Sequence, residues 1–152
     1  MASNMASRIV GDTVWTQRVV KINSKKRGIH IITDTIIEKI PELKKYKIGL
    51  AHLCIQHTSA SLSLNECWDP SVRQDMEMML NKLAPENAPY THTLEGPDDM
   101  PAHVKTSLMG ASITLPITDG KLALGTWQGI WLCEHRNHAS ERKIVVTLQG
   151  VQ

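Results

Sequence analysis

Polar and apolar residues alternate between His57 and Glu66, in a segment around which the predicted fold can be built. If this segment forms a strand, Ala60, Leu62 and Leu64 share one face, because successive side chains of a strand point to opposite sides. The opposite face then carries a polar row: Ser59, Ser61, Ser63 and Asn65. We expect the apolar face to lie in the core. The polar face is either an ordinary solvated sheet surface or, with His57 and Glu66, one wall of a binding site.

Apolar residues also cluster at strand length earlier in the chain. Residues 13–22 and 29–32 are predicted to form a hairpin that turns over residues 23–28. Between residues 48 and 57 both parities are largely apolar, as in a strand that is covered on both faces. We therefore expect residues 48–57 to be the central strand of the sheet.

The last third of the chain predicts two further hairpins. Residues 113–117 and 121–134 flank an Asp-Gly turn, which is typical of a tight β-hairpin. The segment 121–134 is then expected to turn over residues 137–140 and pair with residues 142–149.

Two helices are predicted from their start signals. Thr35 and Glu38 match a capping box in front of a short helix that is disturbed at Pro41. Asp69 and Pro70 match an N-cap followed by proline at the first helical position. Apolar residues recur at helical spacing after Pro70, and we expect them to face the core.

A long segment without periodicity, residues 84–101, follows the second helix. A loop of this length inside a compact domain is usually functional or disordered. It leads through Pro101 into a short third helix, with His103 and Lys105 expected in its first turn and Gly110 at its end.

Together these elements predict a single α+β domain with a mainly antiparallel sheet and two to three short helices. The predicted domain spans residues 13–152. Residues 1–12 are predicted to be a flexible N-terminal extension.

Composition narrows the range of partners. The net charge of +2 and the absence of a basic stripe argue against a nucleic-acid partner. No segment approaches the roughly 18 consecutive apolar residues of a membrane span, so no membrane partner is expected. Cys54, Cys67 and Cys133 show no C-x-x-C spacing. We interpret them as buried reduced thiols of a cytoplasmic protein.

Candidate chemistry rests on histidines, because the common nucleotide-binding and hydrolase motifs are missing from the sequence. His57, His92 and His103 fall at three predicted element boundaries, and zinc sites with an open position take three protein ligands. Their spacing alone does not distinguish metal ligands from hydrogen-bonded structural histidines. The candidate cofactor is a divalent metal, zinc or alternatively Mg²⁺, and whether His30 or His135 joins the site stays open.

Basic side chains expected near the polar face of segment 57–66 predict a phosphate-binding site. Lys105, Arg136 and Arg142 are the candidates, helped by the free amides at the start of the helix after Pro101. The alternative is ordinary surface charge, above all for Arg136.

Trp127 and Trp131 lie four residues apart in one predicted strand and therefore share a face. A buried pair or an oligomer interface is the favoured interpretation. Gly125 and Gly129 flank this flat apolar face, and from it we expect a homotrimer.

Three longer segments resemble one known family. Residues 57–66, 95–105 and 124–136 are similar, in sequence and in order, to the YjbQ-type family, which is also labelled secondary thiamine-phosphate synthase. The similarity covers about residues 13–150. It implies a YjbQ-like α+β domain, a homotrimer and a histidine-lined metal or anion site near the subunit boundaries. It also implies a weak ability to join the pyrimidine pyrophosphate and thiazole phosphate halves of thiamine phosphate.

The resemblance further implies roles for individual residues. His57, Asn65 and Glu66 are expected to act in catalysis, with Glu66 accepting a proton or orienting a ligand histidine. A divalent ion on His57, His92 and His103 would neutralise the leaving pyrophosphate. The phosphorylated substrate is expected to contact Ser59, Ser61, Lys105 and Arg142. Two other functions stay open: a non-catalytic trimeric binder of a metal or phosphorylated metabolite, and a metal-dependent hydrolase.

Overall fold

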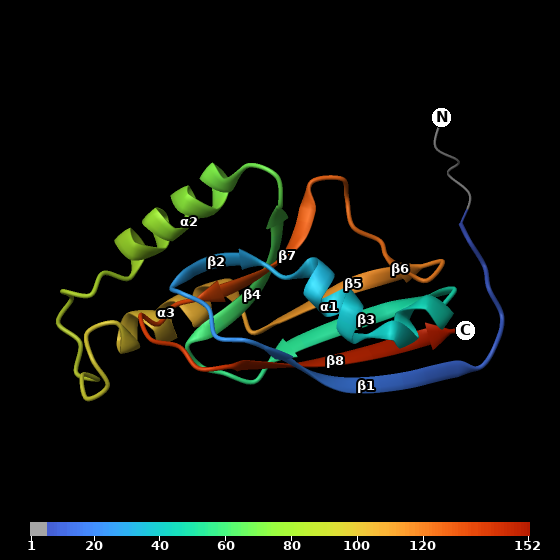
Figure 1. Cartoon of the computed structure of the whole chain (residues 1–152), viewed down its shortest axis with the longest axis horizontal. Helices are drawn as coiled ribbons and strands as arrows, with labels where there is room; N and C mark the ends of the chain where they lie inside the picture. Colours follow the sequence, from blue (N-terminus) through green and yellow to red (C-terminus); the bar gives the residue numbers. More distant parts are fainter. Residues whose placement is uncertain (1–5) are drawn as a thin grey trace.

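Two antiparallel sheets enclose one hydrophobic core between them (Figure 1). The computed structural model describes residues 6–152. The elements in chain order are β1 (Thr13–Ile22), β2 (Gly28–Ile31), α1 (Thr33–Lys39), the 3₁₀ helix η1 (Pro41–Lys45), β3 (Ile48–Ile55), β4 (Ala60–Glu66), α2 (Pro70–Leu83), α3 (Asp99–Met109), β5 (Ser112–Thr118), β6 (Lys121–Leu122), β7 (Gln128–Glu134) and β8 (Arg142–Val151). The predicted α+β class with a single compact domain is confirmed.

The larger sheet has the strand order β1-β8-β3-β5-β6. As predicted, β3 is its central strand, but the expectation that both of its faces are covered is wrong. Ala51 and Leu53 face the core and are fully buried, whereas Leu50 on the opposite face is 47% exposed. Apolar side chains therefore lie on both faces of β3, but only one of these faces packs into the core.

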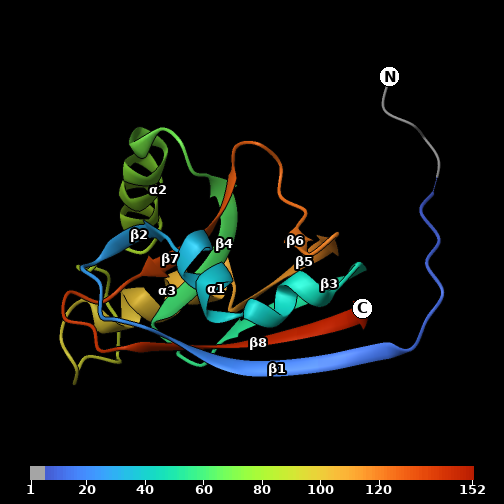
Figure 2. The same cartoon turned by 45° about the vertical axis from the view of Figure 1, so that its right-hand side comes forward.

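The smaller sheet has the order β2-β7-β4 and covers the core from the other side. Ala60 and Leu62 of β4 point into the core, as predicted. The polar face of β4 turns toward α2 and α3, which lie over this sheet (Figure 2). Ser61 is fully buried there, so the polar row is not a solvated surface along its whole length.

Strand partners differ from the predicted hairpins, although most strand positions agree. β1 pairs with β8, and β2 pairs with β7 in the other sheet, so the predicted β1–β2 hairpin is wrong. β7 and β8 belong to different sheets, and the second C-terminal hairpin is also wrong. The hairpin between β5 and β6 is confirmed, with positive φ at Asp119 and Gly120. Residues 123–127 then leave the larger sheet, which divides the predicted strand 121–134 into β6 and β7.

The helices begin close to where they were predicted. At α2 the Asp69 carboxylate accepts a hydrogen bond from the Ser71 amide, 2.8 Å away, as the N-cap prediction requires. The capping box at Thr35 is wrong, because α1 already begins at Thr33 without a side-chain cap. α3 begins at Asp99 and not at Pro101, which places His103 in its second turn. Gly110, with φ of 103°, ends α3 as predicted.

Other expectations concern the surface. Met79 and Leu83 of α2 are exposed, so only part of the apolar stripe of α2 faces the protein interior. The cysteines are free, but of the three only Cys133 is fully buried. No helix within residues 6–152 is long and apolar enough to cross a membrane. The prediction for residues 1–12 falls partly on residues 1–5, which lie outside the described part of the chain.

Candidate metal centre

His92, Asp99 and His103 converge at the start of α3. One possible ligand atom from each lies within 4.8 Å of the other two. Asp99 and His103 are separated by one helical turn, so their side chains lie on the same face of α3. His92 reaches them from the long loop that precedes the helix. The Asp99 side chain is only 3% exposed, whereas that of His92 is 49% exposed, so the group reaches from the interior to the surface.

The hydrogen bonds of His103 show that this group fits a cation. Its Nδ1 lies 3.0 Å from the carbonyl oxygen of Thr58. Because a carbonyl only accepts, Nδ1 must carry the hydrogen, and in the neutral ring Nε2 then holds the lone pair. That Nε2 lies 3.4 Å from Asp99 Oδ2. A lone pair and a carboxylate oxygen repel each other, so a proton or a metal ion between them is favourable. The same Oδ2 also lies 2.8 Å from His92 Nε2, which places both imidazoles on one carboxylate oxygen.

Arg136 holds the second oxygen of Asp99. Its Nη1 donates to Asp99 Oδ1 at 2.6 Å, its Nε to Asp98 Oδ2 at 2.9 Å, and its Nη2 to the carbonyl of Glu95 at 2.8 Å. The guanidinium is therefore bound to the loop and to the start of α3. It is neither free surface charge nor an available phosphate ligand in this chain. It orients Asp99, as residues behind metal ligands commonly do.

His57 does not belong to this group. Its Nε2 accepts from the Lys143 amide at 2.8 Å, and its Nδ1 faces Arg142 Nη1 at 3.3 Å. Burial, followed by the positive charge of Arg142, lowers the pKa of His57, so its ring is neutral at pH 7. Asp99 takes the place that the sequence interpretation gave to His57. The signal for Asp99 was its four-residue spacing from His103, which a helix starting at Asp99 turns into a contact.

A hollow of about 440 Å³ opens beside His103. It is lined by His57, Thr58, His103, Thr106, Ser107, Gly110 and Ala111. No carboxylate lines it, and the buried hydroxyl oxygen of Thr106 has no hydrogen-bond partner. A second hollow, of about 300 Å³, is lined by His92 and Tyr90. The convergent group thus borders two cavities and is accessible to a small ligand.

Arg142 lies behind the first hollow in a buried ion pair. Its Nε and Nη2 donate to the two carboxylate oxygens of Glu134 at 2.7 and 2.6 Å. Nη2 also lies 3.2 Å from Ser59 Oγ. Arg142 is only 5% exposed, so in this chain it supports His57 and Ser59 and does not reach into the cavity.

Lys105 of α3 and Ser61 of β4 are both fully buried. Lys105 Nζ donates to Asn81 Oδ1 at 2.6 Å, and burial, followed by the charge of Arg27, lowers its pKa. Ser61 Oγ lies 2.8 Å from His135 Nε2. Neither predicted phosphate ligand lines the two hollows. His135 is equally buried and does not join the metal group.

Asn65 and Glu66 lie at the far end of β4. Six residue steps along the strand lead from Ala60 to Glu66, which corresponds to about 20 Å. Asn65 Oδ1 accepts from the Glu66 amide at 2.8 Å, and Glu66 Oε2 is buried without a partner. Within one chain, these two predicted catalytic residues are therefore remote from His103. His30 is also remote, with its Nε2 2.7 Å from the carbonyl of Lys26.

The tryptophans do not form the predicted shared face. Trp131 is fully buried, and its Nε1 donates to the carbonyl of Glu66 at 2.9 Å. Trp127 precedes β7 and is 57% exposed. It meets Trp68 edge to face, with ring centroids 6.1 Å apart. The break before β7 separates the two side chains that a continuous strand would have placed together.

Comparisons with known proteins agree with the fold. The family model described as "UPF0047 protein YjbQ-like" matches residues 18–151. UPF0047 protein YjbQ of Salmonella typhimurium is 54% identical over 137 residues, which cover 90% of this chain and 99% of the relative. A UPF0047 protein of Methanocaldococcus jannaschii is 45% identical over 115 residues, or 76% of this chain and 80% of the relative.

Solved structures show the same architecture. A YbjQ-like protein of unknown function from Sulfolobus solfataricus superposes with a TM-score of 0.81 at 26% identity, covering 91% of this chain and 99% of that chain. A YjbQ/UPF0047 family protein from Clostridium acetobutylicum has a TM-score of 0.77 at 33% identity, covering 86% and 98%. From the family match and these identities, the chain belongs to the YjbQ (UPF0047) family.

Proposed function

We propose that this protein is a metal-dependent enzyme acting on a phosphorylated small molecule. The observation that carries the proposal is the convergence of one possible ligand atom each from His92, Asp99 and His103 within 4.8 Å of one another. We further propose, from the resemblance of the sequence motifs, that its reaction is the weak joining of pyrimidine pyrophosphate to thiazole phosphate with release of pyrophosphate.

The donor set favours zinc. Two imidazoles and one carboxylate are a common zinc ligand set that leaves a position open, whereas Mg²⁺ prefers oxygen ligands and retains several waters. Zinc is therefore the proposed ion, held by His92, Asp99 and His103. His57 lies outside this set and instead borders the cavity beside His103.

In the proposed transfer, the bond between the pyrimidine methylene and the pyrophosphate oxygen breaks, and a bond from the thiazole nitrogen to that carbon forms. A bound divalent ion supplies charge neutralisation for the leaving pyrophosphate. Of the three hydroxyl residues that line the cavity, Ser107 already donates to the His103 carbonyl at 3.0 Å, and the Thr106 oxygen is buried. Thr58 is therefore the proposed hydroxyl donor to phosphate oxygens. The neutral His57 ring leaves the cavity without an added positive charge, and Arg142 is paired with Glu134, so in this proposal anion binding depends on the metal.

Glu66 and Asn65 enter this proposal only through a second subunit. Because about 20 Å of strand separates them from the metal group within one chain, they reach it only if another copy presents them. The expected homotrimer would do this. Trp68 and Trp127, which are 76% and 57% exposed, lie next to Glu66 in sequence or across the sheet. These two tryptophans provide an apolar surface for a contact between subunits.

A metal-dependent hydrolase is the second candidate. It is favoured by the same two-histidine, one-carboxylate set, which zinc hydrolases use to activate water. It is also favoured by the lack of a free cationic side chain lining the first hollow. A non-catalytic trimeric binder of the metal or of a phosphorylated metabolite is the remaining alternative.

Metal analysis combined with an assay tests the proposal. We expect the purified protein to hold about one zinc per chain and to form thiamine phosphate slowly. His92→Ala and His103→Ala should lose both metal and turnover. The matched control is His52→Ala, because His52 lies exposed on the outer face of the larger sheet. Turnover that persists in metal-free protein would contradict the proposed mechanism, and metal binding without turnover would favour the binder.

A further inference from the structure

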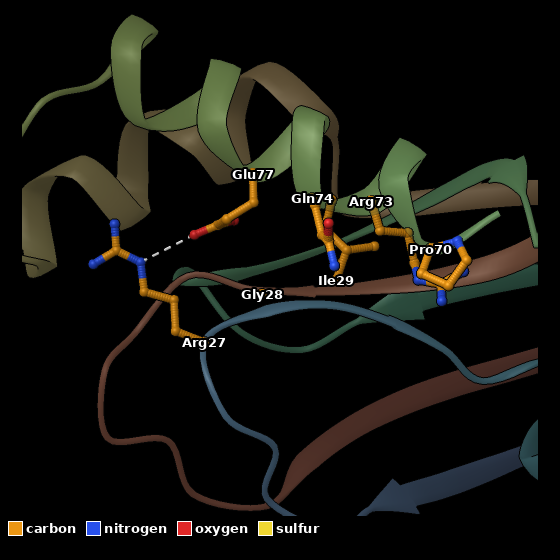
Figure 3. Close-up of a pocket in the computed structure, with 7 residues that line it drawn as sticks. All are labelled: Arg27, Gly28, Ile29, Pro70, Arg73, Gln74 and Glu77. Atoms are coloured by element: carbon orange, nitrogen blue, oxygen red, sulfur yellow. Dashed lines mark hydrogen bonds and ion pairs between the residues drawn. The ribbon is translucent and has the colours of Figure 1, made fainter.

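A groove of about 430 Å³ lies between β2 and α2, away from the candidate metal centre. Arg27, Gly28, Ile29, Pro70, Arg73, Gln74 and Glu77 line it (Figure 3). Figure 3 shows Arg27 and Glu77 at one end of the groove, Arg73 and Pro70 at the other, and Ile29 and Gln74 between them. Its two ends are therefore charged, and its middle holds one apolar side chain, Ile29, beside the exposed Gln74.

Two side chains of opposite charge in this groove each have one atom without a hydrogen-bond partner. Arg73 Nη1 is buried and makes no hydrogen bond, and Glu77 Oε2 is likewise buried and unpaired. Glu77 uses its other oxygen for Arg27, 3.2 Å away. A buried donor or acceptor without a partner costs free energy. The groove therefore favours a ligand with an acidic group near Arg73 and a basic group near Glu77.

The strand along the groove has a free edge. β2 is the outer strand of the smaller sheet and pairs only with β7. The Ile32 amide donates to the Ile130 carbonyl at 2.9 Å, which makes this a hydrogen-bonded pair of the ladder. Because such pairs alternate, the backbone groups of Ile29 and Ile31 point outward. An extended segment can therefore pair with β2 beneath α2.

The chain contains a segment that matches these requirements. Residues 6–12, called the arm below, precede β1 (Figures 1 and 2). Gly11 lies against the Val151 side chain of its own chain, and the arm residues before it extend away from the fold. In an extended arm, Arg8, Val10 and Asp12 share one side. Val10 is 83% exposed although it is apolar. The family match begins at residue 18, after the arm.

We propose that the arm of one copy of this chain adds as an extra strand to β2 of a second copy. Asp12 then lies at Arg73, Val10 lies over Ile29 in the middle of the groove, and Arg8 meets Glu77. The arm runs parallel to β2 in this arrangement, and its backbone pairs with the outward groups of Ile29 and Ile31. Arg73 thereby gains a neighbour of opposite charge, and Glu77 gains a second one beside Arg27.

The arm does not reach the groove of its own chain. It joins β1 at Thr13, whereas the groove lies beyond Ile22 at the other end of that strand. Nine residue steps along β1 span about 30 Å. The seven residues of the arm extend at most about 25 Å. The acceptor must therefore be a second copy, whatever the total number of subunits.

Amide hydrogen exchange on the full-length protein tests the pairing. We expect the Ile29 and Ile31 amides to be protected at high protein concentration. Asp12→Arg, Arg73→Asp and Val10→Glu should each raise their exchange rates, by about tenfold or more where the added strand is lost. Lys82→Asp is the control for Arg73→Asp, because it makes the same charge change at an exposed position of α2 outside the groove.

Mixing the two charge variants distinguishes contact between copies from local damage. When Asp12→Arg and Arg73→Asp chains are combined in equal amounts, the arm of each meets a groove of opposite charge in the other. Protection of Ile29 and Ile31 should then return in the mixture, although each variant alone lacks it. Equal exchange rates in wild type and variants, or no recovery on mixing, would overturn the proposal. Neither readout depends on metal content or turnover.

Discussion

The Nδ1 atom of His103 lies 3.0 Å from the Thr58 carbonyl, and this contact decides which nitrogen of His103 faces Asp99. Thr58 belongs to the turn between β3 and β4, whereas His103 belongs to α3. The packing of α3 against β4 therefore determines the tautomer of a candidate metal ligand. The hydrogen bond of Asp99 to Arg136 fixes the carboxylate in the same way.

The first prediction concerns Asp99→Asn. The asparagine amide can donate a hydrogen bond to the lone pair of His103, but the ion pair of Asp99 with Arg136 is lost, so metal-free stability should fall. The charge that favours a cation is also removed, and zinc should no longer stabilise the protein. In wild type, zinc at 100 times its Kd should add about 2.7 kcal/mol to the free energy of unfolding. Thermal unfolding with and without zinc checks this, and an unchanged zinc response in the variant would contradict the ligand assignment.

The second prediction concerns Arg136→Gln. Loss of the guanidinium frees Asp99 Oδ1 and releases the loop at Asp98 and Glu95. Changes behind metal ligands typically reduce affinity by about 10- to 100-fold, and we expect a decrease in this range. Competition with a chelator of known affinity measures it. Arg18→Gln is the control, because Arg18 pairs with Glu42 at an exposed position away from the site.

The third prediction concerns pH and His135. Burial, followed by the charge of Lys105, lowers the pKa of His135 to about 3, whereas an unfolded histidine titrates near 6.5. Between about pH 6.5 and 3 this histidine is therefore protonated in the unfolded chain but not in the folded chain. The free energy of unfolding falls as pH decreases through this range. The loss should be on the order of a few kcal/mol.

His135→Gln tests this linkage, because glutamine keeps a polar partner for Ser61 but does not titrate. Urea unfolding at several pH values should show a weaker dependence on pH below 6.5 in the variant. His52→Gln, at an exposed position, should retain the wild-type dependence. Identical pH profiles for wild type and His135→Gln would show that His135 is not the group responsible.

Local patterns predicted the strands and α2 well, because alternation and capping depend on neighbouring residues. The central position of β3 and the buried face of β4 followed from such patterns. Strand partners did not, because pairing β1 with β8 joins residues more than a hundred positions apart. Nothing in the local sequence distinguishes that partner from the adjacent β2.

The candidate site was predicted only in part for the same reason. His92 and His103 were identified, and the structure brings them together. Asp99 was missed because the start of α3 was placed at Pro101, which hid its one-turn spacing from His103. Lys105 was read as a ligand-binding cation because sequence does not reveal that its side chain is fully buried.

The last prediction concerns Glu66 and separates a catalyst from a binder. If Glu66 transfers a proton or orients a ligand histidine, Glu66→Gln keeps its shape but should lower thiamine-phosphate formation by about 10²- to 10⁴-fold. Pyrophosphate affinity should change far less. If the protein only binds, removing the charge of Glu66 should leave the trace rate unchanged or raise it. Unchanged turnover in Glu66→Gln, with loss in His103→Ala, would end the acid–base assignment.

Mixed subunits then show where Glu66 acts. Glu66 lies at the end of β4, whereas His103 of α3 contacts Thr58 just before β4 begins. A shared site therefore needs Glu66 from one copy and His103 from another. Glu66→Gln and His103→Ala chains are combined in equal amounts. A Glu66→Gln chain still has its histidine, and a His103→Ala chain still has its carboxylate. A site is therefore intact where the first kind of chain contributes the histidine and the second kind contributes the carboxylate. Random assembly makes about a quarter of all sites intact, so roughly that fraction of wild-type turnover should return. If both residues acted within one chain, every chain would lack one of them, and mixing would restore nothing.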